Sequence, residues 1–159
     1  MKALRVLFAC VVLFAAFCCV NEARAQFKTS GFFLGTLGYY TFNETAFGGL
    51  TGYVGVSRNN RGLGVMGSYE VGNTTFEGYD VQIQFTNFYF SASLKLGSTT
   101  LMVSEGFTTT KGSLEEFEVS RSGYATAITL IYDRGSRIKF MGQVRIQGEG
   151  IMLTAGVGF

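Results

Sequence analysis

The sequence predicts an all-β protein, a closed antiparallel up-and-down transmembrane β-barrel of eight to ten strands. Three observations lead to this prediction. Apolar and polar residues alternate with a period of two along most of the chain, and almost no stretch shows helical spacing. Short turn sequences separate the alternating segments. The first 25 residues have the layout of a secretory signal peptide.

Residues 1–25 are expected to be a cleaved signal peptide. The segment starts with positive charge at Lys2 and Arg5, continues with an apolar run over residues 6–20, and ends on the small-x-small site Ala23-Arg24-Ala25. The run is too short for a spanning helix, which needs roughly 20 apolar residues. A lipid-modified Cys18 or Cys19 is the alternative, although bulky Phe17 precedes this pair where a small residue is usual. Residues 26–159 then form a single β-barrel domain.

Cleavage changes the chemistry available to the mature chain. All three cysteines, Cys10, Cys18 and Cys19, lie in the signal, so neither a disulfide nor a cysteine-bound metal is expected. Three cations and one anion are also lost, which reduces the formal net charge from +2 to 0. A neutral chain has no basic excess for nucleic acid, so no nucleic-acid partner is expected.

The absence of histidine argues against an enzyme. With no histidine in the chain and no cysteine in its mature part, Ser-His-acid and Cys-His catalysis are both excluded. Hydrolysis by paired carboxylates stays formally open, but short outer loops leave little room for a substrate cleft. Residues 62–67 match G-x-G-x-x-G, yet no helix follows them as a dinucleotide site requires. We therefore expect no catalytic, cofactor-binding or metal-binding residues.

The alternation assigns one apolar and one polar face to each strand. Phe88, Phe90 and Leu94, for example, alternate with Tyr89, Ser91 and Lys95. Together with the turn signals, the pattern gives ten segments: 28–42, 47–58, 61–72, 78–86, 88–97, 99–109, 113–121, 124–132, 136–147 and 150–159. If 113–132 is one long bulged strand, the count falls to nine. If the first segment or another one also merges with its neighbour, the count falls to eight. Single-chain bacterial barrels have even counts, so eight and ten remain, with a slight preference for ten.

The predicted turns set the orientation of a ten-strand barrel. Asn59-Asn60, Thr86-Asn87, Thr110–Gly112 and Asp133–Gly135 would lie on the side of the two chain ends, and Gly97-Ser98 and Ser122-Gly123 on the opposite, outer side. Each two-residue turn places its flanking residues on the same sheet face. Phe85 and Phe88 would then both point toward lipid.

We expect the apolar face to point outward, into a membrane. Strands of about 9 to 11 residues match a tilted bilayer crossing, and aromatic residues fall near the strand ends, as in interfacial girdles. The opposite face carries large polar side chains in mid-strand, including Gln143 and Arg145. In a soluble barrel the same pattern would be inverted, with the apolar face inside.

The signal peptide, the alternating strands and a last strand ending in Phe159 resemble small bacterial outer-membrane β-barrels of the OmpA transmembrane domain or OmpX-like type. The resemblance covers the whole mature chain and rests on pattern. It implies location in the outer membrane of a Gram-negative bacterium, with lipid as the main partner. It also implies that Val157 and Phe159 belong to the C-terminal signal read by the barrel-assembly machinery, with periplasmic chaperones acting in transit. The short loops depart from the group, whose members often have long external loops.

A cluster of charged residues is expected in the lumen. Its members are Glu70, Asp80, Lys95, Glu118, Lys139 and Arg145, and all but the deeper Lys139 are placed toward the outer end. Since buried charges must pair or be solvated, these residues either close the lumen with salt bridges or line water individually.

Three functions fit the sequence. The first is a non-enzymatic integral outer-membrane barrel with a structural, adhesive or envelope-maintenance role. The second is a narrow pore for small solutes, which needs a continuous wet path. The third is a soluble secreted calycin-like barrel that binds an apolar ligand inside. Neither an oligomeric state nor a ligand follows from the sequence.

Overall fold

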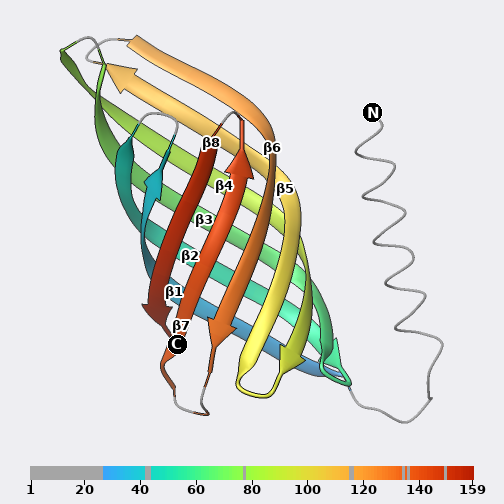
Figure 1. Ribbon diagram of the computed structural model, residues 1–159. Coiled ribbons are helices and arrows are strands. Elements are labelled where there is room, and N and C mark those ends of the chain that lie inside the picture. Colours follow the sequence, from blue (N-terminus) through green and yellow to red (C-terminus); the bar gives the residue numbers. More distant parts are fainter. Residues whose placement is uncertain are drawn as a thin grey trace.

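The computed structural model describes residues 27–41, 44–76, 78–114, 117–133, 135, 137–148 and 150–159. They form a closed barrel of eight antiparallel strands in chain order (Figure 1). The strands are β1 (Lys28–Tyr40), β2 (Thr45–Arg58), β3 (Arg61–Phe76), β4 (Tyr79–Leu96), β5 (Thr99–Leu114), β6 (Phe117–Tyr132), β7 (Lys139–Gln147) and β8 (Gly150–Gly158). The predicted all-β barrel is thus confirmed, with eight strands.

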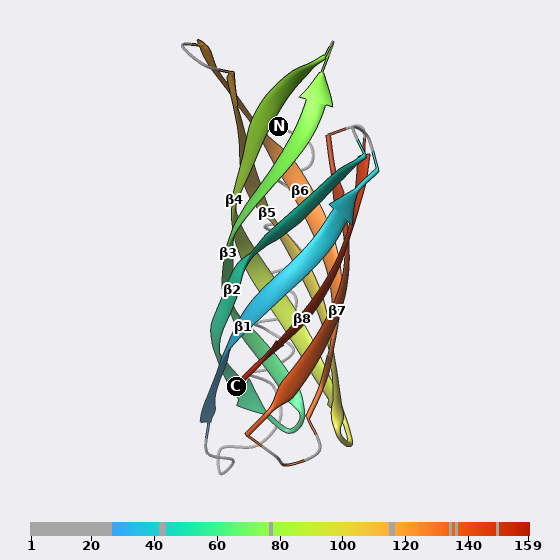
Figure 2. The same cartoon turned by 90° about the vertical axis from the view of Figure 1, so that its left-hand side faces the viewer.

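The barrel closes because the last strand pairs with the first. The β1–β8 ladder runs from Leu34 opposite Gly158 to Tyr40 opposite Met152. Phe33 and Phe159 extend it by exchanging two backbone hydrogen bonds of 2.7 and 3.1 Å. Figure 2 shows β8 lying between β7 and β1. The sheet therefore has no open edge along this seam, where unpaired amides would be costly in an apolar environment.

Two predicted turns are confirmed. Asn59 and Asn60 have φ angles of 49° and 66°, the left-handed conformation that a two-residue hairpin turn needs. They connect β2 to β3, and Gly97-Ser98 connects β4 to β5.

Three other predicted turns are wrong, because Thr86-Asn87, Thr110–Gly112 and Ser122-Gly123 lie inside β4, β5 and β6. Thr86 pairs with β3 on one side and β5 on the other, and Lys111 likewise pairs with β4 and β6. A chain reversal at either place would break two ladders to form one local turn. The ten-strand segmentation therefore fails, since the segments on either side of each supposed turn are single long strands.

The loss of these turns changes which residues point inward. Without a turn at residues 86–87, Phe85 and Phe88 lie on opposite faces of β4. Phe85 is fully buried in the barrel, whereas Phe88 is 48% exposed on its outside. The expectation that both face outward is wrong, and the interior is more apolar than the polar lumen predicted from the sequence.

The two ends of the barrel differ. One end, which we call the terminal end, carries Phe27, Phe159 and the connections at 59–60, 97–98 and 133–138. The opposite end, which we call the loop end, carries the connections β1–β2, β3–β4, β5–β6 and β7–β8. Gly97-Ser98 therefore lies on the side of the chain ends, and its predicted outer position is wrong. Phe42 and Asn43, the acidic residues Glu115 and Glu116, and the predicted signal peptide fall outside the described residues.

At the loop end, four strands continue beyond the barrel wall. The β2–β3 ladder stops at Ala46 opposite Asn73, and the β6–β7 ladder stops at Ala125 opposite Gln147. The β4–β5 ladder continues to Gln82 opposite Ser113. The outer parts of β3, β4, β5 and β6 thus form a four-stranded sheet, which we call the extension (Figure 1); β2 and β7 do not pair with it in the part of the chain that the structure describes.

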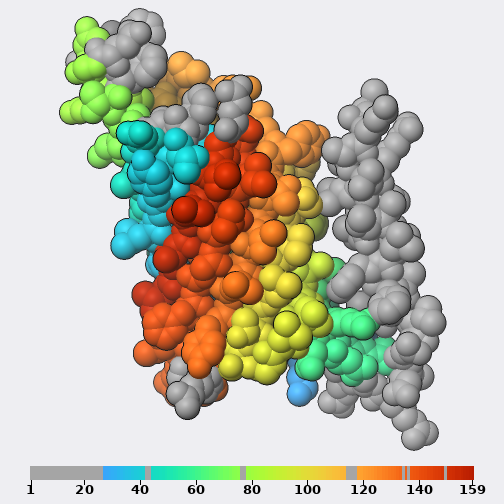
Figure 3. All heavy atoms as spheres, in the orientation of Figure 1, coloured from blue at the N-terminus to red at the C-terminus, as the bar shows by residue number. Residues whose placement is uncertain are grey.

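The outer wall confirms the predicted apolar face. Its large exposed residues include Phe33, Leu50, Val54, Phe88, Phe90, Leu94, Val103, Ile128, Leu130, Phe140, Val144, Ile146, Ile151, Leu153 and Val157. In the space-filling view, side chains of β7 and β8 cover the face toward the viewer without a gap in the barrel wall (Figure 3). The described residues contain no helix with the length and apolarity needed to span a bilayer.

A charge on this outer wall should destabilise the folded protein in a membrane. Ile128 lies in the middle of the outward row of β6 and is 52% exposed. We expect Ile128→Lys to lower the free energy of unfolding by about 2–4 kcal/mol, measured by urea titration in phospholipid vesicles. Ser120→Lys, on the same face of β6 but in the extension, is the matched control and should have little effect. Equal losses in both variants would contradict a lipid-facing wall.

Candidate functional site in the barrel lumen

The centre of the lumen is crossed by an ion pair between Glu70 of β3 and Arg145 of β7. Arg145 Nη2 donates to Glu70 Oε1 at 2.7 Å and Nη1 donates to Oε2 at 2.8 Å, so the contact is bidentate. Both side chains are fully buried. Successive side chains of a strand point to opposite faces of the sheet. The residues on either side of Glu70 and of Arg145 point outward, so these two side chains point into the lumen. Since β3 and β7 are not adjacent strands, the pair spans the barrel.

Neighbouring polar groups hold both partners in place. Asn87 Nδ2 donates to Glu70 Oε2 at 3.0 Å and to Ser68 Oγ at 2.9 Å. On the other side, Gln143 Oε1 accepts from Arg145 Nη2 at 2.9 Å. These charge-assisted bonds offset part of the cost of removing both charges from water. The ion pair is therefore part of a network that draws on β3, β4 and β7.

The same network continues across the lumen. Gln143 Nε2 donates to Thr129 Oγ1 of β6 at 2.9 Å. The guanidinium of Arg145 lies 5.7 Å from the centre of the Tyr89 ring, within the range of a cation–π contact. Arg145 Nη1 also lies 3.0 Å from the sulfur of Met152 on β8.

A glycine makes room for the acid. Gly49 of β2 is paired with Glu70 in the sheet. A Cβ built on Gly49 would clash with the backbone oxygen of Tyr69 and lie 2.7 Å from the Cα and 2.8 Å from the Cγ of Glu70. A larger residue would displace β3 at Tyr69 and Glu70, so glycine at this position allows the close backbone approach that strand glycines often mark.

Apolar side chains fill the lumen on both sides of the ion pair. Toward the loop end lie Tyr40, Phe47, Ile83, Phe85 and Met152. Toward the terminal end lie Leu34, Met102, Ile131 and Met141. An eight-strand barrel is just wide enough for side chains to fill. The middle of the barrel is therefore a packed core that contains one charged network.

The six charged residues predicted for the lumen do not form one cluster. Glu70 and Arg145 pair with each other, Lys95 and Lys139 lie at one opening of the barrel, and the other two lie in the extension. Glu118 lies in the extension, where its carboxylate accepts from Lys111 Nζ at 2.9 Å and raises the pKa of that lysine through the hydrogen bond and the opposite charge. Asp80 is also in the extension and accepts from Thr75 Oγ1 at 3.4 Å.

Lys95 and Lys139 lie at the terminal end and line its opening. Lys95 lies away from its predicted outer position, because the connection after it is on the side of the chain ends when the barrel has eight strands. Lys139 follows the connection at 133–138, which lies on the side of the chain ends with either strand count.

Sequence reasoning missed Asn87, Ser68 and Tyr89. The sequence predicts a turn at Asn87, because Thr-Asn between two aromatic residues resembles a hairpin. Ser68 and Tyr89 face inward by parity, but nothing in their surroundings along the chain marks a contact with Arg145. Among the residues that the structure describes, no group of three or more acidic side chains could hold a metal ion.

Removing one partner of the central ion pair should cost more than removing both. We expect Glu70→Gln and Arg145→Met each to reduce the free energy of unfolding by about 3–5 kcal/mol, because an uncompensated or unsatisfied group stays buried. The double variant should recover part of this loss, as measured by urea titration in vesicles.

The exposed pair provides the control for that cycle. Lys111→Gln and Glu118→Gln should each have little effect, since solvent already screens this ion pair. Strictly additive losses at Glu70 and Arg145 would show that the two side chains do not interact in the folded protein.

No protein-family model and no curated protein sequence matches the chain. Solved structures resemble it in fold. Ail, the attachment invasion locus protein of Yersinia pestis, in complex with the heparin analogue sucrose octasulfate, has a TM-score of 0.56 at 14% identity, over 82% of this chain and 95% of that chain.

Two further structures are similar. A de novo designed transmembrane β-barrel has a TM-score of 0.54 at 12% identity, over 87% of this chain and 97% of that one. Neisserial surface protein A (NspA) has a TM-score of 0.50 at 9% identity, over 84% of this chain and 96% of that one. The chain thus has the architecture of small outer-membrane eight-strand barrels, and the resemblance predicted from its sequence is confirmed at the level of the fold.

Proposed function

We propose that the mature chain, residues 26–159, is a non-enzymatic integral protein of a bacterial outer membrane. One observation carries this proposal: large apolar residues cover the outside of the barrel while its most polar pair is buried within. Ile128 and Phe140 are 52% and 55% exposed, whereas Glu70 and Arg145 are fully buried. In water this distribution would expose a wide apolar surface, but in a bilayer it is the expected one.

The route to the membrane follows from the two ends of the chain. Residues 1–25 would direct export and be removed. Val157 and Phe159, exposed at the end of β8, would then be recognised by the barrel-assembly machinery, with periplasmic chaperones acting before insertion. With both chain ends in the periplasm, the extension projects outward from the cell.

The extension supports an adhesive role within this class. It presents Tyr79, Val119 and Tyr124, which are 61%, 70% and 61% exposed. Among the described residues, no strand pairs with the outer edge of β6 beyond Ala125. Such an edge can pair with an extended peptide. The similar structure from Yersinia pestis is that of an attachment invasion locus protein, which agrees with contact to another surface. We propose that the extension makes that contact.

An enzymatic role receives no support from the lumen. The central network consists of an acid and a base that pair bidentately with each other and are enclosed by apolar side chains. Neither group can reach a substrate, and the chain has no histidine to activate a nucleophile. A structural or envelope-maintenance role needs only the stable barrel.

Fractionation tests the membrane location. We expect the protein to sediment with outer membranes, to need detergent for extraction, and to migrate faster on a gel before heating than after it, because the paired barrel resists unfolding by detergent. Recovery in buffer without detergent would contradict the proposal and favour the soluble ligand-binding barrel.

Conductance in planar bilayers tests whether the lumen is closed. We expect no large, stable open events for the wild-type protein, because side chains fill the lumen on both sides of the ion pair. The double variant Glu70→Ala, Arg145→Ala should conduct more often, whereas Lys111→Gln should behave as wild type. Large open events in the wild type would instead favour the narrow-pore function.

A further inference from the structure

The terminal end of the barrel contains a cavity of about 800 Å³ that the central ion pair does not use. Asn59, Asn60 and Asp133 at the strand connections line its opening, and Met102 and Ile131 line its deeper part. Those two residues belong to the apolar cluster that blocks the lumen toward Arg145. The cavity is therefore a blind vestibule that opens on the side of the chain ends.

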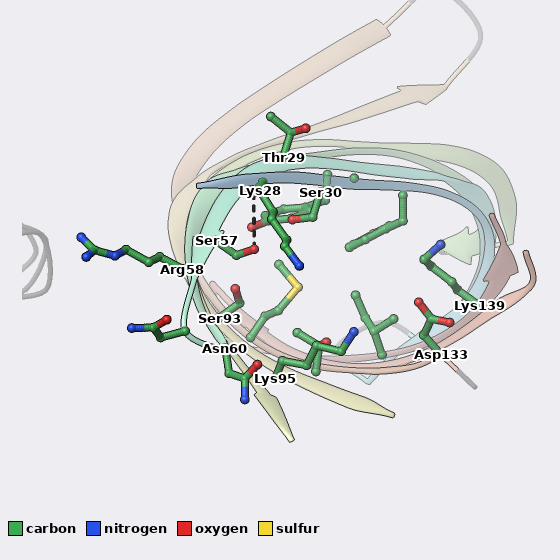
Figure 4. A pocket seen from close by; sticks show the side chains of 17 residues that line it. Lys28, Thr29, Ser30, Ser57, Arg58, Asn60, Ser93, Lys95, Asp133 and Lys139 are labelled. Carbon is green, nitrogen blue, oxygen red and sulfur yellow. Dashed lines mark hydrogen bonds between the residues drawn. The ribbon is translucent and has the colours of Figure 1, made fainter. Parts of the chain in front are cut away.

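Three lysines converge on this vestibule. Lys28 of β1, Lys95 of β4 and Lys139 of β7 approach from different parts of the wall (Figure 4). Arg58 also borders the cavity, but its guanidinium points away from it (Figure 4). Strands far apart in sequence thus supply the positive charge, and only closure of the barrel brings it together.

The positive charge is not neutralised within the vestibule. Asp133 is the acidic residue in its lining, and its carboxylate already accepts from the backbone N–H of Gly135 at 2.9 Å. Among the described residues, none of the three ammonium groups has a carboxylate within ion-pairing distance. The lining inside the opening therefore has a net positive charge, and a low-dielectric wall surrounds it, an arrangement that attracts anions.

The wall below the lysines is aromatic. Phe32 and Tyr53 are stacked with 5.3 Å between ring centres and 20° between ring planes. The buried hydroxyl of Tyr53 has no hydrogen-bond partner among the described residues. A ligand in the vestibule would meet charge at the rim, a flat aromatic wall deeper inside, and an apolar floor.

We propose that this vestibule binds a small organic anion with two or more negative charges and a flat, ring-bearing body. Its charged groups would lie among Lys28, Lys95 and Lys139, and its ring would pack beside Phe32 and Tyr53. The volume is within the range of small-molecule sites. With the chain ends in the periplasm, the ligand enters from that compartment, opposite the extension.

A trisulfonated pyrene dye, 8-hydroxypyrene-1,3,6-trisulfonate, is a suitable probe because it combines a flat ring with three negative charges. We expect saturable binding to the refolded protein in non-ionic detergent, followed by fluorescence anisotropy. Inorganic triphosphate should compete for the lysines but bind more weakly, because it lacks the ring. Added salt should weaken both interactions.

Variants separate the vestibule from the overall charge of the protein. Lys28→Gln, Lys95→Gln and Lys139→Gln should each weaken dye binding by about two- to fivefold, and the triple variant by about tenfold or more. Lys111→Gln removes the same charge from the extension and should bind as wild type. Unchanged gel migration before and after heating would establish that each variant is folded.

Absence of saturable binding to the folded wild-type protein would overturn the proposal, as would an equal loss of affinity in Lys111→Gln. The measurement is made in micelles, so its failure is distinct from a failure of the proposed membrane location, which fractionation tests.

Discussion

Closure of the sheet is the constraint on which the rest of the structure depends. An amide in hydrocarbon has no water to bond, so a spanning sheet must leave no edge. The chain meets this requirement by pairing β8 with β1, down to the bonds between Phe33 and Phe159. The apolar strand β8 is stable in this setting, because its backbone is paired on both sides and its outward side chains meet lipid.

Closure with eight strands also fixes the width of the lumen, and this width determines which side chains can meet across it. Side chains from opposite walls can touch, so Glu70 on β3 reaches Arg145 on β7 directly. Gly49 lets the backbones of β2 and β3 approach closely beside Glu70, and Asn87 and Gln143 add further hydrogen bonds to the pair. The apolar clusters on either side exclude water, so the lumen is divided into a sealed centre and a blind vestibule at the terminal end. The extension continues beyond the barrel at the opposite end.

The sequence predicted the inward position of Glu70 and Arg145, because their neighbours along β3 and β7 are outward-facing apolar residues. It could not predict that they pair, since they are separated by 75 residues and the relation between β3 and β7 depends on the number of strands. For the same reason the ten-strand count places Lys95 toward the outer end, away from the terminal end where it lies. The errors at Thr86-Asn87, Thr110–Gly112 and Ser122-Gly123 have one cause: local turn propensity was counted, but the pairing with neighbouring strands that overrides it is not visible along the chain.

The sequence by itself determined that the chain forms alternating strands with a continuous apolar face, that this face points outward, and that Asn59-Asn60 and Gly97-Ser98 are turns. These features depend on neighbouring residues, so a local pattern is enough to reveal them. Only the tertiary structure decided the count of eight, the inward position of Phe85, the pairing of Glu70 with Arg145, and the convergence of Lys28, Lys95 and Lys139. These depend on which strands face each other across the lumen, and that relation exists only once the barrel is closed.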